Sequence, residues 1–67
     1  MRYFDFETVA KKAAISREKL DKLCRLIREE FPRDEMMFEL HVLRACLAVL
    51  EGRVNIDQAI QVQAAAA

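Results

Sequence analysis

The chain has 67 residues, of which 54% are hydrophobic, and its eleven basic and eleven acidic side chains leave no net charge. This length allows one domain with a limited core. A single glycine and a single proline argue against a β-rich or loop-rich fold, and no apolar run approaches the ~20 residues of a membrane span. Acids in "MRYFDFET" stand where a signal peptide needs an apolar core, so we expect no export signal and a cytoplasmic protein.

The charges are unevenly distributed along the chain. Residues 1–28 carry eight basic and four acidic side chains, a net of +4, whereas residues 29–67 carry three basic and seven acidic ones, a net of −4. A basic half can face a polyanion, and two oppositely charged halves can also pair with one another.

The first two helices are predicted over about residues 5–14 and 16–31. Asp5 and Ser16 are good N-caps, and each precedes an apolar stripe with helical spacing. Pro32 ends the second helix, because the residue before a proline is disfavoured in helical geometry. The stripes are Phe6, Val9, Ala10 and Ala13 in the first helix and Leu20, Leu23, Cys24, Ile27 and Phe31 in the second.

The third helix is predicted over about residues 34–51, with Asp34 as its N-cap and Gly52 after its end. It carries two apolar stripes, and a helix with two stripes is covered on two sides. In a chain this small a second subunit can cover one of them, so we expect a homodimer. One stripe is Met36, Leu40, Leu43, Leu47 and Leu50, and the other, the expected dimer interface, is Phe38, Val42, Ala45 and Val49.

The fourth helix is predicted over about residues 55–64. Asn55 and Gln58 form a capping box, and Val54 before the cap can pack onto the first turn. The predicted fold is therefore all-α: one domain, a compact bundle of four short helices, with the first two in a helix-turn-helix-like arrangement.

The joint between the first two helices, "VAKKAAIS", resembles the helix-turn-helix of bacterial repressors, most closely the lac-repressor type, which typically reads V-A-x-x-A-G-V-S. Ala14 replaces the glycine of the turn, at a position that usually needs a left-handed backbone, which costs alanine about 1–2 kcal/mol. The residues that carry the resemblance are Val9, Ala10, Ala13, Ala14, Ile15 and Ser16, followed by Leu20 and Leu23.

The resemblance implies that the second helix enters the major groove of double-stranded DNA. Glu18 and Asp21 would lie on the same side of this helix and weaken binding to phosphates. One hypothesis is thus a small DNA-binding protein, a transcriptional regulator that binds as a homodimer. The alternative is a non-enzymatic structural or protein-interaction module without nucleic-acid binding, in which the joint only connects two packed helices. The expected DNA contacts are Lys11, Lys12, Ser16, Arg17, Lys22 and Arg25.

The sequence carries no clear catalytic, metal or cofactor motif. His41 and Cys46 do not have the spacing of zinc ligands, and Glu35 and Glu39 lack the E-x-x-H element of carboxylate metal sites. Cys24 and Cys46 lie on apolar stripes, so we expect buried, reduced thiols. We therefore expect no enzyme activity, no metal and no cofactor.

Overall fold

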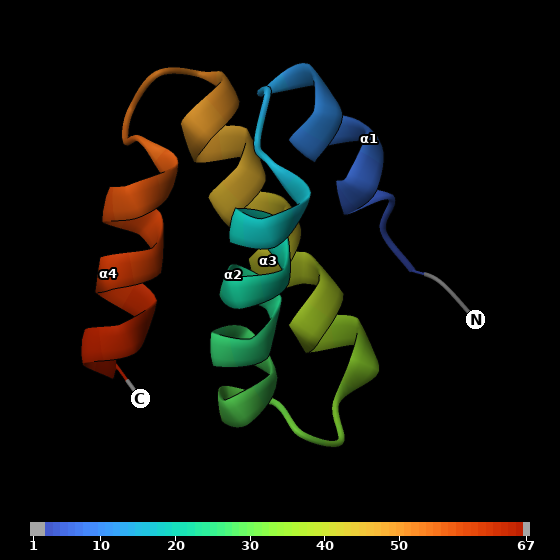
Figure 1. Cartoon of the computed structure of the whole chain (residues 1–67). Coiled ribbons are helices and arrows are strands. Elements are labelled where there is room, and N and C mark those ends of the chain that lie inside the picture. Colours follow the sequence, from blue (N-terminus) through green and yellow to red (C-terminus); the bar gives the residue numbers. More distant parts are fainter. Residues whose placement is uncertain (1–2, 67) are drawn as a thin grey trace.

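A computed structural model describes residues 3–66 of the chain as four helices, with no strand among these residues (Figure 1). The predicted all-α fold of four helices is confirmed. The last helix continues two residues beyond the predicted end, and the first stops two residues before it. The bounds are α1 Phe6–Lys12, α2 Arg17–Glu30, α3 Glu35–Leu50 and α4 Ile56–Ala66.

The predicted capping side chains begin all four helices. The side chains of Asp5, Ser16 and Asp34 each accept a hydrogen bond from the backbone N–H three residues later, at 3.1–3.2 Å. Asn55 and Gln58 form a reciprocal capping box, with bonds of 2.9 and 2.8 Å between each side-chain oxygen and the other backbone N–H. These bonds satisfy N–H groups that the first turn of a helix leaves without a partner.

The joint between α1 and α2 is a tight helix end centred on Ala14. Ala14 adopts the left-handed conformation, with φ of +58°, as expected for this position. Its N–H donates to the carbonyl of Lys11, and the N–H of Ile15 donates to the carbonyl of Ala10, both at 3.0 Å. This pair of bonds is a Schellman motif, and it explains why α1 ends at Lys12 rather than at Ala14.

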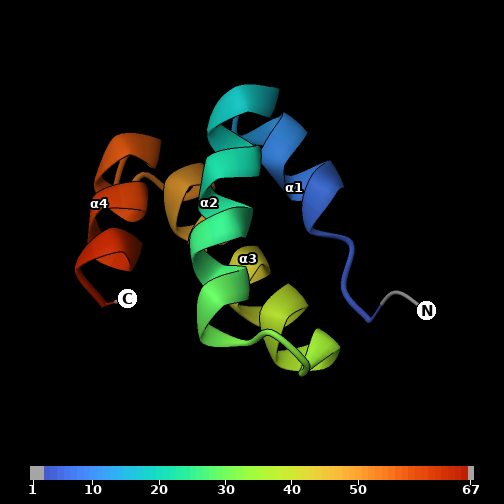
Figure 2. The same cartoon turned by 60° about the horizontal axis from the view of Figure 1, so that its bottom comes forward.

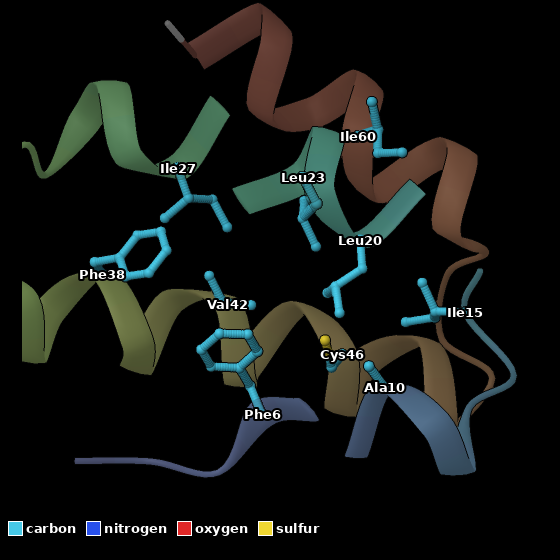
Figure 3. Close-up of a cluster of buried hydrophobic side chains, with 10 residues drawn as sticks. All are labelled: Phe6, Ala10, Ile15, Leu20, Leu23, Ile27, Phe38, Val42, Cys46 and Ile60. Atoms are coloured by element: carbon cyan, nitrogen blue, oxygen red, sulfur yellow. The ribbon is translucent and has the colours of Figure 1, made fainter. Parts of the chain in front are cut away.

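The core forms around α3, which lies behind α2 and between α1 and α4 in the view of Figure 1. α1 packs mainly against α3, and α2 packs against both α4 and α3 (Figure 2). Phe6 and Phe38 meet edge to face, with ring centres 6.3 Å apart. The buried apolar side chains in this cluster, shown in Figure 3, are Phe6, Ala10, Ile15, Leu20, Leu23, Ile27, Phe38, Val42, Cys46 and Ile60.

The predicted dimer interface is therefore incorrect. Phe38 and Val42 are buried in the core of the single chain, and Val42 has no exposed surface. Ala45 and Val49 are half-buried and pack against the same core. The physical reason is that the other three helices pack around this side of α3, so the stripe that we expected to face a second subunit is covered within the chain.

α4 is positioned against α2 by both apolar and polar contacts. Ala59 and Ile60 are buried, and Lys19 Nζ lies 3.0 Å from Asp57 Oδ1 in an ion pair between the two helices. The pair is exposed, so the buried apolar surface contributes most of the stabilisation.

The joint gives a first prediction. Ala14→Gly should raise the free energy of unfolding by roughly 0.5–1 kcal/mol, because relief of the left-handed strain exceeds the entropic cost of a glycine. Urea unfolding followed by circular dichroism measures this change.

Ala13→Gly is the matched control, because Ala13 has an ordinary φ of −81°. It should lower the free energy of unfolding by roughly 0.5–1 kcal/mol. Equal destabilisation by both substitutions would contradict a left-handed Ala14.

Candidate functional site

Two of the residues predicted to contact DNA already have partners within the chain. Ser16 Oγ accepts the capping hydrogen bond of α2. The guanidinium of Arg17 lies 3.4 Å from Glu7 Oε2 and 3.4 Å from Asp21 Oδ1. Exposed ion pairs such as these add little stability, but the two carboxylates offset the charge that a phosphate contact needs.

The other four predicted contacts, Lys11, Lys12, Lys22 and Arg25, are exposed and make no ion pair within residues 3–66. Three of them line different depressions. Lys11 lies beside one of about 220 Å³ between α1 and α2, Lys22 beside one of about 430 Å³ between α2 and α4, and Arg25 beside one of about 450 Å³ next to Phe38. A DNA-binding surface gathers its cations on one face. Here Lys22 and Arg25 are neighbours one turn apart on α2, whereas Lys11 and Lys12 lie in the last turn of α1.

The outward face of α2 also carries charges of both signs. Glu18, Asp21, Arg25 and Glu29 are all exposed and follow one another at steps of three or four residues, so they form one row along the helix. Lys22 is also exposed and lies between Glu18 and Arg25 on this face, so the face carries two bases among three acids, and the acids repel the phosphates that a recognition helix approaches. The row is suited to water or to a mixed-charge protein surface.

α1 and α2 are consecutive in the chain, yet the main packing partner of each is a different helix. Ala10 is buried as expected, but the helix that carries it packs chiefly against α3 rather than under a closely crossing α2. Two small depressions of about 220 Å³ remain between α1 and α2, and both are lined by Glu7, Arg17 and Leu20 among other residues. The joint is therefore a tight turn without a tightly packed helix pair behind it.

A second apolar stripe of α3 lies largely outside the core, although its central member Leu43 is half-buried and packs against the core. Leu40 and Leu47 lie about 140–160° around the helix from Val42, the most central core residue. Met36 is 48% exposed and Leu50 is 41% exposed, whereas the three leucines between them are half-buried. We call this stripe the outer face of α3, and it consists of Met36, Leu40, Leu43, Leu47 and Leu50.

A buried carboxylate, which the sequence did not identify, defines one edge of the outer face. Glu39 is 4% exposed, and its Oε1 accepts hydrogen bonds from the N–H groups of Tyr3 and Phe4 at 2.8 and 2.9 Å. Glu39 lies three residues after Met36 and four before Leu43. The N-terminal segment that it anchors therefore runs along the edge of the stripe, where Tyr3 adds an exposed aromatic side chain.

Glu35 and Glu39, which share a helical spacing, have separate roles. Glu35 pairs with Arg28 at 3.0 Å, and the guanidinium of Arg28 lies 3.7 Å from the centre of the Phe38 ring. Glu39 precedes Val42 by three residues, so its place on the core side of α3 was the signal in the sequence that it would be buried.

Few charges border the outer face. Arg44 is exposed next to Leu40 and Leu47 on the helix surface and makes no ion pair within residues 3–66. Arg33, just before the N-cap of α3, is likewise exposed and unpaired in the described part of the chain. At the other end of the helix, Glu51 pairs with Arg53 at 2.9 Å.

The cysteines and the histidine have structural environments. Both thiols are free, and burial raises the pKa of Cys24 and of Cys46 to about 11, so they remain protonated and weakly nucleophilic at neutral pH. His41 Nδ1 donates to the carbonyl of Met37 at 2.9 Å, and its ring centre lies 4.5 Å from that of Phe31.

Among residues 3–66, no three His, Cys, Asp or Glu side chains are grouped so that they could hold a metal ion. None of the helices described is both long and apolar enough to cross a membrane.

Comparison of the chain with protein-family models, curated proteins and solved structures gave no match.

The raised thiol pKa values predict a loss of stability at alkaline pH. Between about pH 9 and 11 the unfolded chain loses thiol protons that the folded chain retains, so the free energy of unfolding falls as the pH rises. Urea unfolding at several pH values across this window measures the slope.

Cys24→Ala should make this fall shallower, because one of the two shifted thiols is removed. Lysine and tyrosine titration is common to both chains and cancels in the comparison. An unchanged slope in Cys24→Ala would contradict the raised pKa of this thiol.

Proposed function

We propose that the chain is a non-enzymatic protein-interaction module and that the outer face of α3 is its binding surface. The observation that carries the proposal is this apolar stripe, of which only Leu43 packs against the core and whose ends, Met36 and Leu50, are 48% and 41% exposed. Contiguous apolar surface that a fold leaves uncovered marks a site for a partner. Methionine and leucine side chains also adapt readily to the surface of a second helix.

The position of the stripe supports this function. α3 is held by the core through Phe38, Val42 and Cys46, so its outer face is presented on a rigid element. A rigid helix with an apolar row at steps of three and four residues can bind another helix lengthwise. The pairing of Arg17 with Glu7 and Asp21 makes the outward face of α2 the weaker candidate surface.

Double-stranded DNA is the second candidate partner. It is favoured by the exposure of Lys11, Lys12, Lys22 and Arg25, which lack ion pairs within residues 3–66. It is disfavoured by the acids Glu18, Asp21 and Glu29 in the same region of α2. A transcriptional regulator would need these four cations to act together on one duplex.

A photo-crosslinking experiment tests the proposed surface. Benzoylphenylalanine at Leu47 should give one discrete adduct in cells that express the full chain, because this position would be covered by a partner. The same amino acid at Val62, which is 62% exposed on α4, is the matched control and should give no discrete adduct. Similar crosslinking at both positions, or none at position 47, would refute the outer face as the binding surface.

A titration of fluorescent duplex DNA tests the second candidate. We expect no saturable rise in anisotropy at micromolar protein and low salt, because the acids on α2 oppose phosphate contacts. Binding that weakens steeply with salt and is abolished by Lys22→Glu/Arg25→Glu would instead establish the DNA-binding function and displace our proposal.

A further inference from the structure

We infer that the partner on the outer face of α3 is a second copy of this chain, bound as an antiparallel helix pair. The inference rests on the proposed function and specifies its partner. It differs from the homodimer expected from the sequence, whose interface residues Phe38 and Val42 are buried in the core.

The spacing of the stripe is symmetric. From Met36 through Leu40 and Leu43 to Leu47 the steps are four, three and four residues, and the steps are the same when the segment is read backwards. A two-fold interface brings the same surface of both copies together. In an antiparallel pair, the residues of one helix meet those of the other helix in the opposite order along the chain. Met36 then packs against Leu47 of the second copy, and Leu40 packs against Leu43 of the second copy.

The charges at the two ends of α3 favour this arrangement over a parallel one. Arg33 precedes the N-cap, and Glu51, which pairs with Arg53 of its own chain at the exposed surface, follows the last residue of the helix. The antiparallel register that pairs Leu40 with Leu43 brings Arg33 of each copy nearly level with Glu51 of the other. A parallel pair would place Arg33 beside Arg33 and Glu51 beside Glu51, and it would also align the two helix dipoles unfavourably.

The charges on and beside α3 also favour one of two possible antiparallel registers. The quartet from Leu40 to Leu50 is also symmetric, with steps of three, four and three residues. Its register would bring the exposed, unpaired Arg44 close to Arg44 of the second copy and would separate Arg33 from Glu51. The register centred between Leu40 and Leu43 keeps the two Arg44 side chains further apart, so we assign the two-fold axis to that point.

The size of the contact surface determines how tightly we expect the dimer to bind. A helix of 16 residues is about 24 Å long, and one helix pair with its flanks falls below the roughly 1,200 Å² of a standard stable interface. We therefore expect a monomer–dimer equilibrium with a dissociation constant in the micromolar range or weaker.

Sedimentation equilibrium of the purified full chain, from about 10 µM to about 1 mM, tests self-association. The wild-type chain and Val62→Glu should form dimers with the same dissociation constant, whereas Leu47→Glu should remain monomeric. Circular dichroism checks that all three chains are folded. A folded wild-type chain that stays monomeric to about 1 mM overturns the inference.

Disulfide trapping with a mild copper oxidant tests the register. A mixture of Met36→Cys and Leu47→Cys chains should give the mixed disulfide, whereas Met36→Cys alone should not crosslink, and the wild-type chain controls for Cys24 and Cys46. Crosslinking of Met36→Cys with itself would show a parallel pair and overturn the arrangement.

Charge exchange provides a second readout of the same geometry. Arg33→Glu and Glu51→Arg should each weaken the dimer about threefold to tenfold, and the double variant should recover most of the loss, because both ion pairs are restored with reversed signs. Additive losses in the double variant would contradict the contact between these two residues.

The failure of this inference is distinguishable from failure of the proposed function. A monomeric chain whose position 47 still crosslinks to a different protein overturns self-association and leaves the outer face of α3 as a binding surface. A monomeric chain with no adduct at position 47 overturns both.

Discussion

The packing of three helices around one side of α3 is the constraint on which the rest of the structure depends. Val42 has no exposed surface and belongs to a cluster to which all four helices contribute side chains (Figure 3). Because α3 is apolar around most of its circumference, burial of Phe38, Val42 and Cys46 orients the opposite stripe outwards. The same rotation places Glu39 under the N-terminal segment, where its carboxylate accepts two backbone N–H groups. The outer face is thus a consequence of how the core is filled.

The local features of the fold could be predicted from the sequence, because they depend on neighbouring residues. Asp5, Ser16 and Asp34 cap their helices, and the strained turn at Ala14 was expected from the residue that the repressor pattern places there. The choice between the two stripes of α3 could not be predicted in the same way. Both stripes have helical spacing and similar apolar content, and only the positions of α1, α2 and α4 decide which one is covered.

In the candidate site, too, features set by neighbouring residues could be predicted from the sequence, whereas features set by the placement of the helices could not. The exposure of Lys22 and Arg25 followed from the apolar stripe on the other side of α2. The pairing of Arg17 with Glu7, ten residues earlier on another helix, depends on how α1 and α2 are placed relative to each other. That pairing and the acids beside the cations are the reasons why we propose a protein partner on α3 rather than a nucleic acid.

The central claim is that the outer face of α3 binds a second copy of this chain. Methyl NMR of the purified chain over a dilution series tests it most directly, because leucine and valine methyls report on each surface separately. We expect concentration-dependent shifts for the methyls of Leu40, Leu43 and Leu47, with those of the buried Leu23 and the exposed Val62 unchanged. Shifts confined to methyls away from α3, or constant shifts throughout the series, would contradict it.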